Sequence, residues 1–472
     1  MRNIYTFVVL VVALVFCGCG DATPVIIKGE NYSFSAESGM IHFDEPQRAA
    51  NQQSMLGYAA APLDVVRVGF VGLGMRGRDA VSRFTHIEGV EIKALADLVQ
   101  RNVDYCSGYL ESVGWPQAEG YVGEEAYKEL CRRDDIDLVY ISTDWSSHVP
   151  IALYAMEQGK HVAIEVPAAT SVKECWQLVD MSERTRCHCM MLENCVYDFF
   201  ELTTLNMVEQ GLFGEILHAE GAYIHNLTEY WDAYHDNWRL EFNSTHRGDV
   251  YATHGLGPIC MALDIHRGNR LEYLVSMDTK SVNGLAIARD RMGVTEFANG
   301  DHTMTMIKTL RGQSIMLQHN VFTPRPYNRL YQLTGTHGFA NKYPIEGFTF
   351  VEGVLPAELL PEGAHVDQHN FLAEDVKAAI MEAYKHPIHR EIEDVARRVG
   401  GHGGMDYVMD YRLVYCLRNG LPLDQDVYDA AEWSSIGELT ATSAKHNSMP
   451  VAIPDFTRGE WNRLTGVTFH TK

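Results

Sequence analysis

The sequence has no cluster of basic residues and few basic residues overall. It contains 39 lysines and arginines against 62 aspartates and glutamates, which gives a formal net charge of −23. A protein that binds the phosphate backbone of a nucleic acid needs a basic surface. We therefore expect no nucleic-acid partner. Internal repeats and low-complexity blocks are also lacking, and no apolar stretch after the first twenty residues is long enough to span a membrane.

The sequence also lacks cysteines and histidines at the spacing of a metal site. Two of the ten cysteines, Cys17 and Cys19, lie in the N-terminal segment, and the others are scattered along the chain. None of them combines with histidine in a pattern typical of zinc, so we predict no metal site. Most of these cysteines are expected to be buried thiols, although an exported protein could form one or two disulfides between them.

The N-terminal segment is typical of an export signal. A short basic start precedes an apolar run over residues 6–16, which is too short for a membrane span but suits a signal peptide. The run ends at Cys17-Gly18-Cys19, which resembles a bacterial lipoprotein cleavage box. Phe16 departs from that box, where leucine is favoured, so cleavage without lipid is the alternative. We predict a lipoprotein-type signal peptide over residues 1–19, with Cys19 as the residue that carries the lipid. The lipid would anchor the exported protein to a membrane, either in the periplasm or at the cell surface.

The mature chain is long enough for two domains. Residues 20–61 are polar and read as a tether and an N-terminal arm. Over residues 62–195, apolar runs alternate with helical stretches, which predicts a Rossmann domain with a doubly wound parallel sheet. The capping pattern of Ser171 and Glu174 predicts a helix start within it. The strands are expected at 65–71, 90–96, 137–142, 161–165 and 187–192.

Residues 196–472 follow a different pattern, with strand-like runs separated by fewer helices. The runs favour a C-terminal α/β domain with a large, mainly antiparallel sheet that is open on one face. An open apolar face would readily pack against a copy of itself, so we expect a homo-oligomer formed through this sheet. The strands are expected at 216–224, 273–277, 303–310, 314–317 and 329–334, and helices near 368–384 and 407–419.

A glycine-rich loop after the first strand predicts a dinucleotide site. Residues 72–77 match G-x-G-x-x-G, follow a buried strand and open a helix, so helix N-terminal amides can bind the pyrophosphate. Asp97 stands at the end of the second strand, where a carboxylate binds the ribose diol and repels a 2′-phosphate; this favours NAD over NADP. The alternative is a plain turn with a capping aspartate. The predicted cofactor residues are Gly72, Gly74, Met75, Arg76, Gly77 and Asp97.

Motifs after the fourth strand carry a family resemblance. Glu165-Val166-Pro167 stands where the Gfo/Idh/MocA oxidoreductases have Glu-Lys-Pro, and the loop that ends in His148 is similar to that family's segment near the cofactor. The resemblance implies that His148 and Glu165 also lie at the cofactor; Glu165 as a simple helix cap is the alternative. The family's lysine is Val166 here, and because a valine cannot donate a proton, simple sugar dehydrogenation by the family's usual route is in doubt.

Further motifs resemble glycoside hydrolase family 109 over about residues 60–465. They are the segments 193–198, 237–239, 248–258, 324–327 and 335–339, of which the Tyr-x-x-His segment in its glycine-rich setting is the most specific. The family contains NAD-dependent α-N-acetylgalactosaminidases, and its members also have valine after the strand-end glutamate. The resemblance implies a carbohydrate substrate with terminal α-linked N-acetylgalactosamine.

The chemistry of such a site differs from that of an ordinary glycosidase, which works with two carboxylates. If NAD⁺ oxidises C3 of the sugar, the proton at C2 becomes acidic, a base removes it, and the group at C1 leaves by elimination. Water then adds, and the retained cofactor reduces C3 again. This oxidation, elimination, addition and reduction sequence is redox-neutral and needs a C2 base and an acid for the leaving group.

Tyr251 and His254 are the predicted catalytic pair. One helical turn would place both side chains on the same face, where a phenol and an imidazole could share proton transfers. Tyr197, Arg239, Tyr251 and Tyr327 match family positions that contact the sugar. The alternatives are core packing for the tyrosines and an ion pair for Arg239.

Two other functions stay open. One is an NAD-dependent sugar oxidoreductase of the Gfo/Idh/MocA type, against which Val166 counts. The other is a non-catalytic glycan-binding lipoprotein, against which the intact glycine loop and the Tyr251/His254 pair count. The exported NAD-dependent glycosidase is the leading hypothesis.

Overall fold

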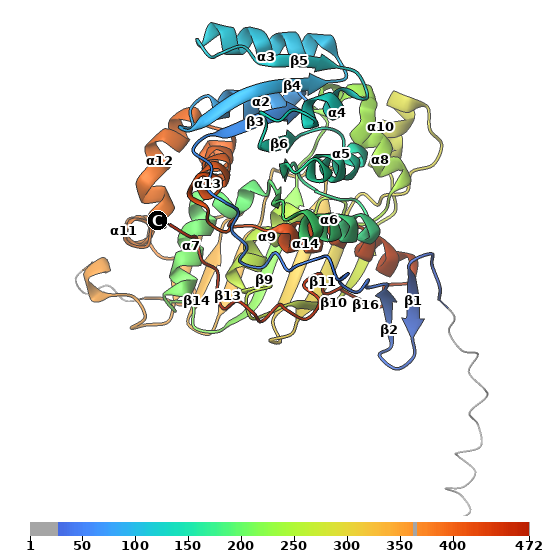
Figure 1. The fold of residues 1–472 in the computed structure, drawn as a ribbon. Coiled ribbons are helices and arrows are strands. Elements are labelled where there is room, and N and C mark those ends of the chain that lie inside the picture. Colours follow the sequence, from blue (N-terminus) through green and yellow to red (C-terminus); the bar gives the residue numbers. More distant parts are fainter. Residues whose placement is uncertain (1–26, 362–365, 472) are drawn as a thin grey trace, which may run out of the picture.

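The protein is built on two β-sheets, which the computed structural model describes over residues 27–361 and 366–471 (Figure 1). The predicted signal peptide and Cys19 lie outside these residues. Within the described ranges, no helix is both long and apolar enough to cross a membrane.

The smaller sheet is the predicted doubly wound one. Its order is β5-β4-β3-β6-β7-β8, and all its strands are parallel. Numbered along the chain this is 3-2-1-4-5-6, the order of a dinucleotide-binding sheet. Helices cover both faces, so the central strand β6 is buried at every position. The strands are β3 (Val66–Val71), β4 (Val90–Asp97), β5 (Glu119–Val122), β6 (Leu138–Ile141), β7 (His161–Ile164) and β8 (Cys189–Met191).

Two helices of this half begin at a side-chain cap, and one of these caps was predicted. Ser171 Oγ accepts a hydrogen bond from Glu174 N, which confirms the helix start there; the Glu174 carboxylate turns to Thr170 N. Asp144 caps the helix that begins at Trp145 in the same way, through Ser146 N. The helices are α2 (Met75–Phe84), α3 (Gln100–Ser112), α4 (Ala126–Cys131), α5 (Trp145–Glu157) and α6 (Val172–Thr185).

The larger sheet has ten strands in the order β1-β2-β16-β10-β11-β12-β9-β13-β14-β15. Its pairs are antiparallel except β12 with β9 and β16 with β2, which confirms the predicted mainly antiparallel sheet. The strands are β1 (Tyr32–Ser35), β2 (Met40–Phe43), β9 (Ile216–Ile224), β10 (Leu271–Asp278), β11 (Thr303–Thr309), β12 (Ser314–Asn320), β13 (Tyr331–Gly335), β14 (Gly338–Asn341), β15 (Gly347–Phe350) and β16 (Val451–Ala452).

One face of the larger sheet is covered by helices that also contact the smaller sheet. Helix α14 (Val427–Lys445) packs on β10, α6 and β8, and α9 (Thr253–Ala262) packs on β9, so the two halves share one core (Figure 1). The approach of α9 is close: a Cβ on Gly221 would lie 2.2 Å from the carbonyl oxygen of Gly255. On the other face, Met304 and Met306 of β11 point outward and are more than 40% exposed.

The remaining helical segments surround the core. They are η1 (Asn194–Tyr197), α7 (Phe199–Glu209), η2 (Trp231–Ala233), η3 (His235–Asn237), α8 (Trp238–Thr245), α10 (Asn283–Met292), η4 (Ala357–Leu359), α11 (Glu374–Ala383), α12 (Pro387–Val399), η5 (His402–Gly404) and α13 (Met405–Asn419).

The N-terminal arm is more structured than the sequence suggests. Its hairpin β1–β2 joins the larger sheet through β16, and Arg48 forms a 3.0 Å ion pair with the buried Glu183 of α6. Strands of only four residues give little periodicity signal.

The disulfides allowed for in the sequence are not formed among the described residues. The eight cysteines from Cys106 to Cys416 are all free and all buried.

Candidate functional site

A cavity of about 780 Å³ lies between the glycine loop of the first half and helix α9 of the second. Its lining includes Gly72, Gly74, Met75, Arg76, Asp97, His148, Glu165, Arg239, Tyr251, His254 and Tyr327. The structure therefore brings together eleven of the predicted site residues, although they are spread over more than 250 positions of the sequence.

The glycine loop has the shape of a dinucleotide cradle. Gly72 has a φ of +87°, and a Cβ there would lie 2.6 Å from the carbonyl oxygen of Ser142. A Cβ on Gly77 would lie 1.9 Å from the carbonyl oxygen of Gly72. At Gly74, by contrast, a Cβ would meet nothing within 4 Å, so the open space beside the N-terminus of α2 can take a pyrophosphate. The residues present therefore fit a bound dinucleotide.

Asp97 holds the loop as well as facing the cavity. Its Oδ2 accepts a hydrogen bond from Leu73 N (2.6 Å), and its Oδ1 accepts from Val99 N (2.8 Å) and Asn102 Nδ2 (3.0 Å). A carboxylate has about four acceptor positions, so it retains capacity for a ribose hydroxyl. The strand-end aspartate thus stands where the predicted ribose contact requires it.

Two of the predicted cofactor residues pair with each other. Arg76 Nε donates to Glu165 Oε1 (2.9 Å), and its Nη1 donates to Asp406 of α13 (2.9 Å). His148 is buried and lies between two backbone carbonyls, those of Pro167 (2.8 Å) and Thr143 (3.2 Å). These contacts make Arg76 and His148 supports of the cavity wall at the strand ends.

The other wall carries the predicted sugar residues. The ring of Tyr251 stacks on that of Trp145 with centroids 5.5 Å apart, and the Arg239 guanidinium lies 4.5 Å from the Tyr251 ring. Arg239 Nη1 donates to Tyr234 Oη (2.8 Å). Because a guanidinium has five N–H donors, Arg239 retains donors for hydroxyl or amide oxygens of a ligand.

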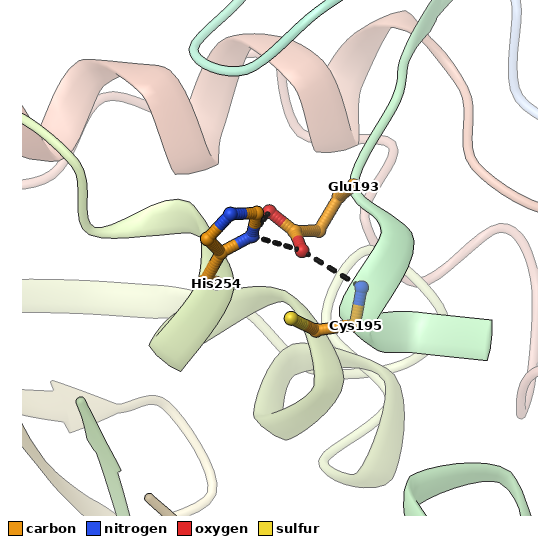
Figure 2. Close-up of side chains that lie close together, drawn as sticks. All are labelled: Glu193, Cys195 and His254. Carbon is orange, nitrogen blue, oxygen red and sulfur yellow. Dashed lines mark hydrogen bonds and ion pairs between the residues drawn. The ribbon is translucent and has the colours of Figure 1, made fainter. Parts of the chain in front are cut away.

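His254 is held by a buried carboxylate that the sequence analysis did not single out as a site residue. Its Nδ1 donates to Glu193 at 2.7 Å (Oε1) and 2.9 Å (Oε2), and the same carboxylate accepts from Cys195 N (3.0 Å), as Figure 2 shows. Glu193 lies between β8 and η1, and α9 brings His254 to it. With Nδ1 as the donor, Nε2 of the neutral ring is the basic nitrogen.

The electrostatics of this pair favour a neutral imidazole beside a carboxylate. Burial lowers the pKa of His254; Glu193 raises it, and Arg329 lowers it again, so the pKa stays below its ordinary value. Burial raises the pKa of Glu193, but His254 and the Cys195 amide bring it below its ordinary value. His254 is therefore suited to accept a proton.

Glu193, His254 and the thiol of Cys195 also form the one group of potential metal ligands found among the described residues, with ligand atoms within 4.8 Å of one another. Arg329 Nη1 lies 3.2 Å from Cys195 Sγ, and both Glu193 oxygens are bonded to His254. A cation placed there would face the guanidinium and displace those bonds. The cluster is better described as a hydrogen-bonded support for His254.

Tyr251 and His254 meet without sharing a helical face. Helix α9 begins at Thr253, so Tyr251 lies in the turn before it, and the two rings contact edge to face with centroids 4.9 Å apart. The predicted proximity is present, but the predicted geometry is not. A turn before the helix places the phenol against Trp145, where a regular helix would not.

Tyr197 lies outside the cavity. It is fully buried in η1, and its hydroxyl donates to Asp424 (3.3 Å), so the structure does not bring it to the other predicted sugar residues. Tyr223 of β9 takes a place in the wall instead, with its ring 4.7 Å from Tyr251 and 5.4 Å from His254. Tyr223 can be recognised as a residue of the cavity wall only from the position of β9 over α9.

A second imidazole–carboxylate pair faces the cavity and was also missed. His402 is flanked by two glycines on each side, and all five residues of the loop, 400–404, have positive φ. His402 Nδ1 lies 2.9 Å from Asp406 Oδ2, and its side chain is 38% exposed, against 4% for His254. Burial raises the pKa of Asp406, but Arg76, Arg83 and His402 bring it well below its usual range, so it stays a carboxylate. In the sequence, the run Gly-Gly-His-Gly-Gly is the feature that could have indicated His402.

Two family models match the chain in succession. The model "Oxidoreductase family, NAD-binding Rossmann fold" matches residues 66–193, and the model "Glycosyl hydrolase 109, C-terminal domain" matches residues 197–463. The first match, together with the fit of the glycine loop, confirms NAD as the cofactor.

Relatives match over most of the chain. Glycosyl hydrolase family 109 protein 1 of Bacteroides fragilis (strain YCH46) is 58% identical over 89% of this chain and 91% of its own length. Glycosyl hydrolase family 109 protein 1 of Bacteroides thetaiotaomicron is 56% identical, with 91% and 93% covered.

Solved structures share the fold at low identity. A levoglucosan dehydrogenase in complex with NADH and L-sorbose has a TM-score of 0.62 at 17% identity, covering 83% of this chain and 100% of the other. The myo-inositol dehydrogenase of Lactobacillus casei, in complex with NAD(H) and myo-inositol, has a TM-score of 0.55 at 16% identity, with 83% and 99% covered. The two-sheet architecture is thus that of sugar and polyol dehydrogenases.

Proposed function

The chain belongs to glycoside hydrolase family 109 and is an NAD-dependent glycosidase, and on that premise we propose that it removes terminal, α-linked N-acetylgalactosamine. The observation that carries the proposal is the Glu193–His254 pair beside Tyr251, in a cavity that also contains the glycine loop. Val166, buried where the dehydrogenases have lysine, supports a glycosidase over a simple oxidoreductase.

The cavity holds both partners of the reaction at once. Gly74, Asp97 and the N-terminus of α2 would hold the dinucleotide, and Tyr223, Arg239 and Tyr251 line the part left for a sugar. Bound NAD supplies a reversible oxidation of the sugar, which makes the hydrogen on the neighbouring carbon acidic. An acetamide group at that carbon would find the donors of Arg239 within the same wall.

His254 is suited to the proton transfers at the ring. Its Nε2 is basic because Nδ1 donates to Glu193, and its ring is neutral because it is buried. We assign it as the base that removes the C2 proton, with the Tyr251 hydroxyl beside it as a hydrogen-bond partner for a sugar hydroxyl. Glu193 acts through His254 and is a positioning residue.

His402 is suited to the leaving group. A terminal sugar enters the cavity with its aglycone directed outward, and the His402 imidazole is more exposed than that of His254. As the C1–O bond breaks, its electron pair goes to the glycosidic oxygen, which takes a proton from His402 Nε2. When water adds to C1, His402 accepts a proton from that water, and His254 returns a proton to C2.

A chromogenic α-N-acetylgalactosaminide tests the proposal, incubated with and without added NAD⁺ while aglycone release and NADH absorbance are both followed. We expect aglycone release without net NADH, and its loss in Tyr251→Phe and His254→Ala. Net NADH in proportion to the sugar consumed would make the protein an oxidoreductase. A binding protein would give neither signal on any glycoside.

Two further proposals concern location and assembly. The N-terminal segment supports export and lipidation at Cys19, which predicts that Cys19→Ala moves the protein from the detergent phase to the aqueous phase of a Triton X-114 partition. The exposed methionines on the open face of the larger sheet support a homo-oligomer in which a second copy covers that face.

A further inference from the structure

The aromatic rings of the cavity form a continuous track that leads from the buried site to its mouth. Tyr251 and Tyr223 are buried with ring centroids 4.7 Å apart. From Tyr223 the track continues to His225 (5.8 Å), whose ring is in edge-to-face contact with Tyr230 (5.2 Å) and Tyr327 (4.9 Å). All five rings line the same cavity.

The outer end of the track is open. Tyr230 is 40% exposed and Tyr327 is 41% exposed, whereas the two inner tyrosines are below 10%. Large aromatic side chains that remain exposed at the rim of a cavity offer an apolar face with a polar tip, which suits the apolar face and hydroxyl edge of a sugar ring. One sugar ring beside His254 would leave this outer end uncovered.

The rim is held in place before any ligand binds. His225 Nδ1 is 3.1 Å from Tyr223 Oη, and His225 N donates to the carbonyl oxygen of Asn320 (2.9 Å). Next to Tyr230, the buried Trp231 stacks on Phe322 with centroids 5.9 Å apart. Rigid support of this kind lowers the conformational entropy lost when a ligand is bound.

We propose that His225, Tyr230 and Tyr327 form a subsite for the second sugar ring of a glycan, the one attached through the bond that is cleaved. The inference rests on the proposed function and deepens it, because it makes the substrate an oligosaccharide. His402, assigned to the glycosidic oxygen, lines the same cavity as these three rings and lies close enough to His225 to help lower the pKa of that ring. A leaving group released at His402 can therefore extend over the three rings.

The test compares two substrates with the same terminal α-N-acetylgalactosamine, a methyl glycoside and a disaccharide. In Tyr230→Ala, the ratio of kcat/KM for the disaccharide to that for the methyl glycoside is expected to fall about tenfold, mainly through KM. Tyr230→Phe keeps the ring and should keep the ratio. Tyr105→Ala removes a tyrosine on α3 that is still more exposed and does not line the cavity, and it should also keep the ratio.

Binding provides a second readout without turnover. In the His254→Ala background, saturation-transfer NMR should show contact with the protons of both rings of the disaccharide, and Tyr230→Ala should weaken the signal of the second ring. An unaltered ratio in Tyr230→Ala would overturn the subsite. A wild-type protein inert on both substrates would instead refute the proposed function.

Discussion

Nδ1 of His254 lies 2.7 Å from Oε1 of Glu193, and the carboxylate is fully buried although no arginine side chain pairs with it among the described residues. This contact joins the end of the smaller sheet to helix α9 of the second half. It fixes which nitrogen of the imidazole carries the proton and so which one can act on a substrate.

Glu193→Gln should therefore impair catalysis more than binding. The amide cannot stabilise the imidazolium that forms when His254 accepts a proton, so we expect kcat to fall by about 10²–10⁴-fold with a much smaller change in KM. Steady-state kinetics measure this, and Glu193→Asp should restore part of the activity. Glu91→Gln makes the same change at an exposed carboxylate and serves as the control. A kcat within threefold of wild type would contradict the role of Glu193.

His402→Ala should make the rate depend on the leaving group. A 2,4-dinitrophenolate departs without protonation, whereas a methoxide needs an acid, so kcat/KM should fall about 100-fold more for the methyl glycoside than for the dinitrophenyl glycoside. Exchange of the C2 hydrogen in D₂O, followed by NMR, should persist because His254 is intact.

His302→Gln provides the matched control for His402. His302 is a partly exposed imidazole that does not line the cavity, and burial and the nearby Arg325 lower its pKa. Its substitution should affect both glycosides alike. Equal losses in His402→Ala, or loss of the C2 exchange, would place His402 elsewhere in the reaction.

The glycine loop predicts two different outcomes for similar substitutions. Gly77→Ala creates a clash within the protein, 1.9 Å from the carbonyl oxygen of Gly72, so both thermal stability and NAD affinity should fall. Gly74→Ala meets no protein atom, so it should keep the melting temperature while weakening NAD binding at least tenfold. Calorimetric titration with NAD and thermal unfolding separate the two. Gly108→Ala, in the open on α3, should leave NAD affinity intact.

Stability should decline as the pH falls from about 6.5 to 4. Burial lowers the pKa of His161 and His389 to about 4 and that of His319 to about 3. In this window the unfolded chain binds protons that the folded chain does not, so unfolding becomes more favourable as the pH falls. Each fully buried histidine contributes on the order of 1–3 kcal/mol.

A variant separates the contribution of a buried histidine from that of groups that stabilise the fold as the pH falls. Burial raises the pKa of Asp249 to about 7, which stabilises the fold at low pH. His161→Asn should therefore flatten the slope of unfolding free energy against pH, measured by denaturant titration at pH 7 and pH 5. The same slope in the variant and in wild type would exclude His161 as a source.

The open face of the larger sheet predicts how the protein assembles. Met277 pairs with Met304, and Met306 pairs with Met316, so β10, β11 and β12 present a methionine-rich patch. Met306→Lys should convert an oligomer to a monomer in light scattering after gel filtration, because it places a charge in the buried interface. Val113→Lys, at an exposed position of the first half, should not. A monomeric wild type would refute the assembly.

The chain order of the Rossmann half could be read from the sequence because its signals are local. A strand, the glycine loop of Gly72 to Gly77 and an aspartate one strand later are each set by backbone sterics over a few residues, and the structure places all of them as predicted. Five strands of the second half, β9 to β13, were found from their strand-like runs, whereas the short strands β14, β15 and β16 were not predicted. The hairpin of the N-terminal arm was not predicted because each of its strands has only four residues.

The working part of the site was decided by tertiary structure. Glu193 and His254 are 61 positions apart, and His402 is farther still; each is an ordinary polar residue until α9 and the loop before α13 bring it to the cavity. Tyr197 and Tyr223 show the same dependence: the motif favoured the first, but η1 turns its side chain toward Asp424 and β9 supplies the second. The sequence alone determined the cofactor and the fold class, since close backbone approach and periodicity are local. Only the packing decided which histidines lie beside a carboxylate, because these contacts form between elements that meet across the core.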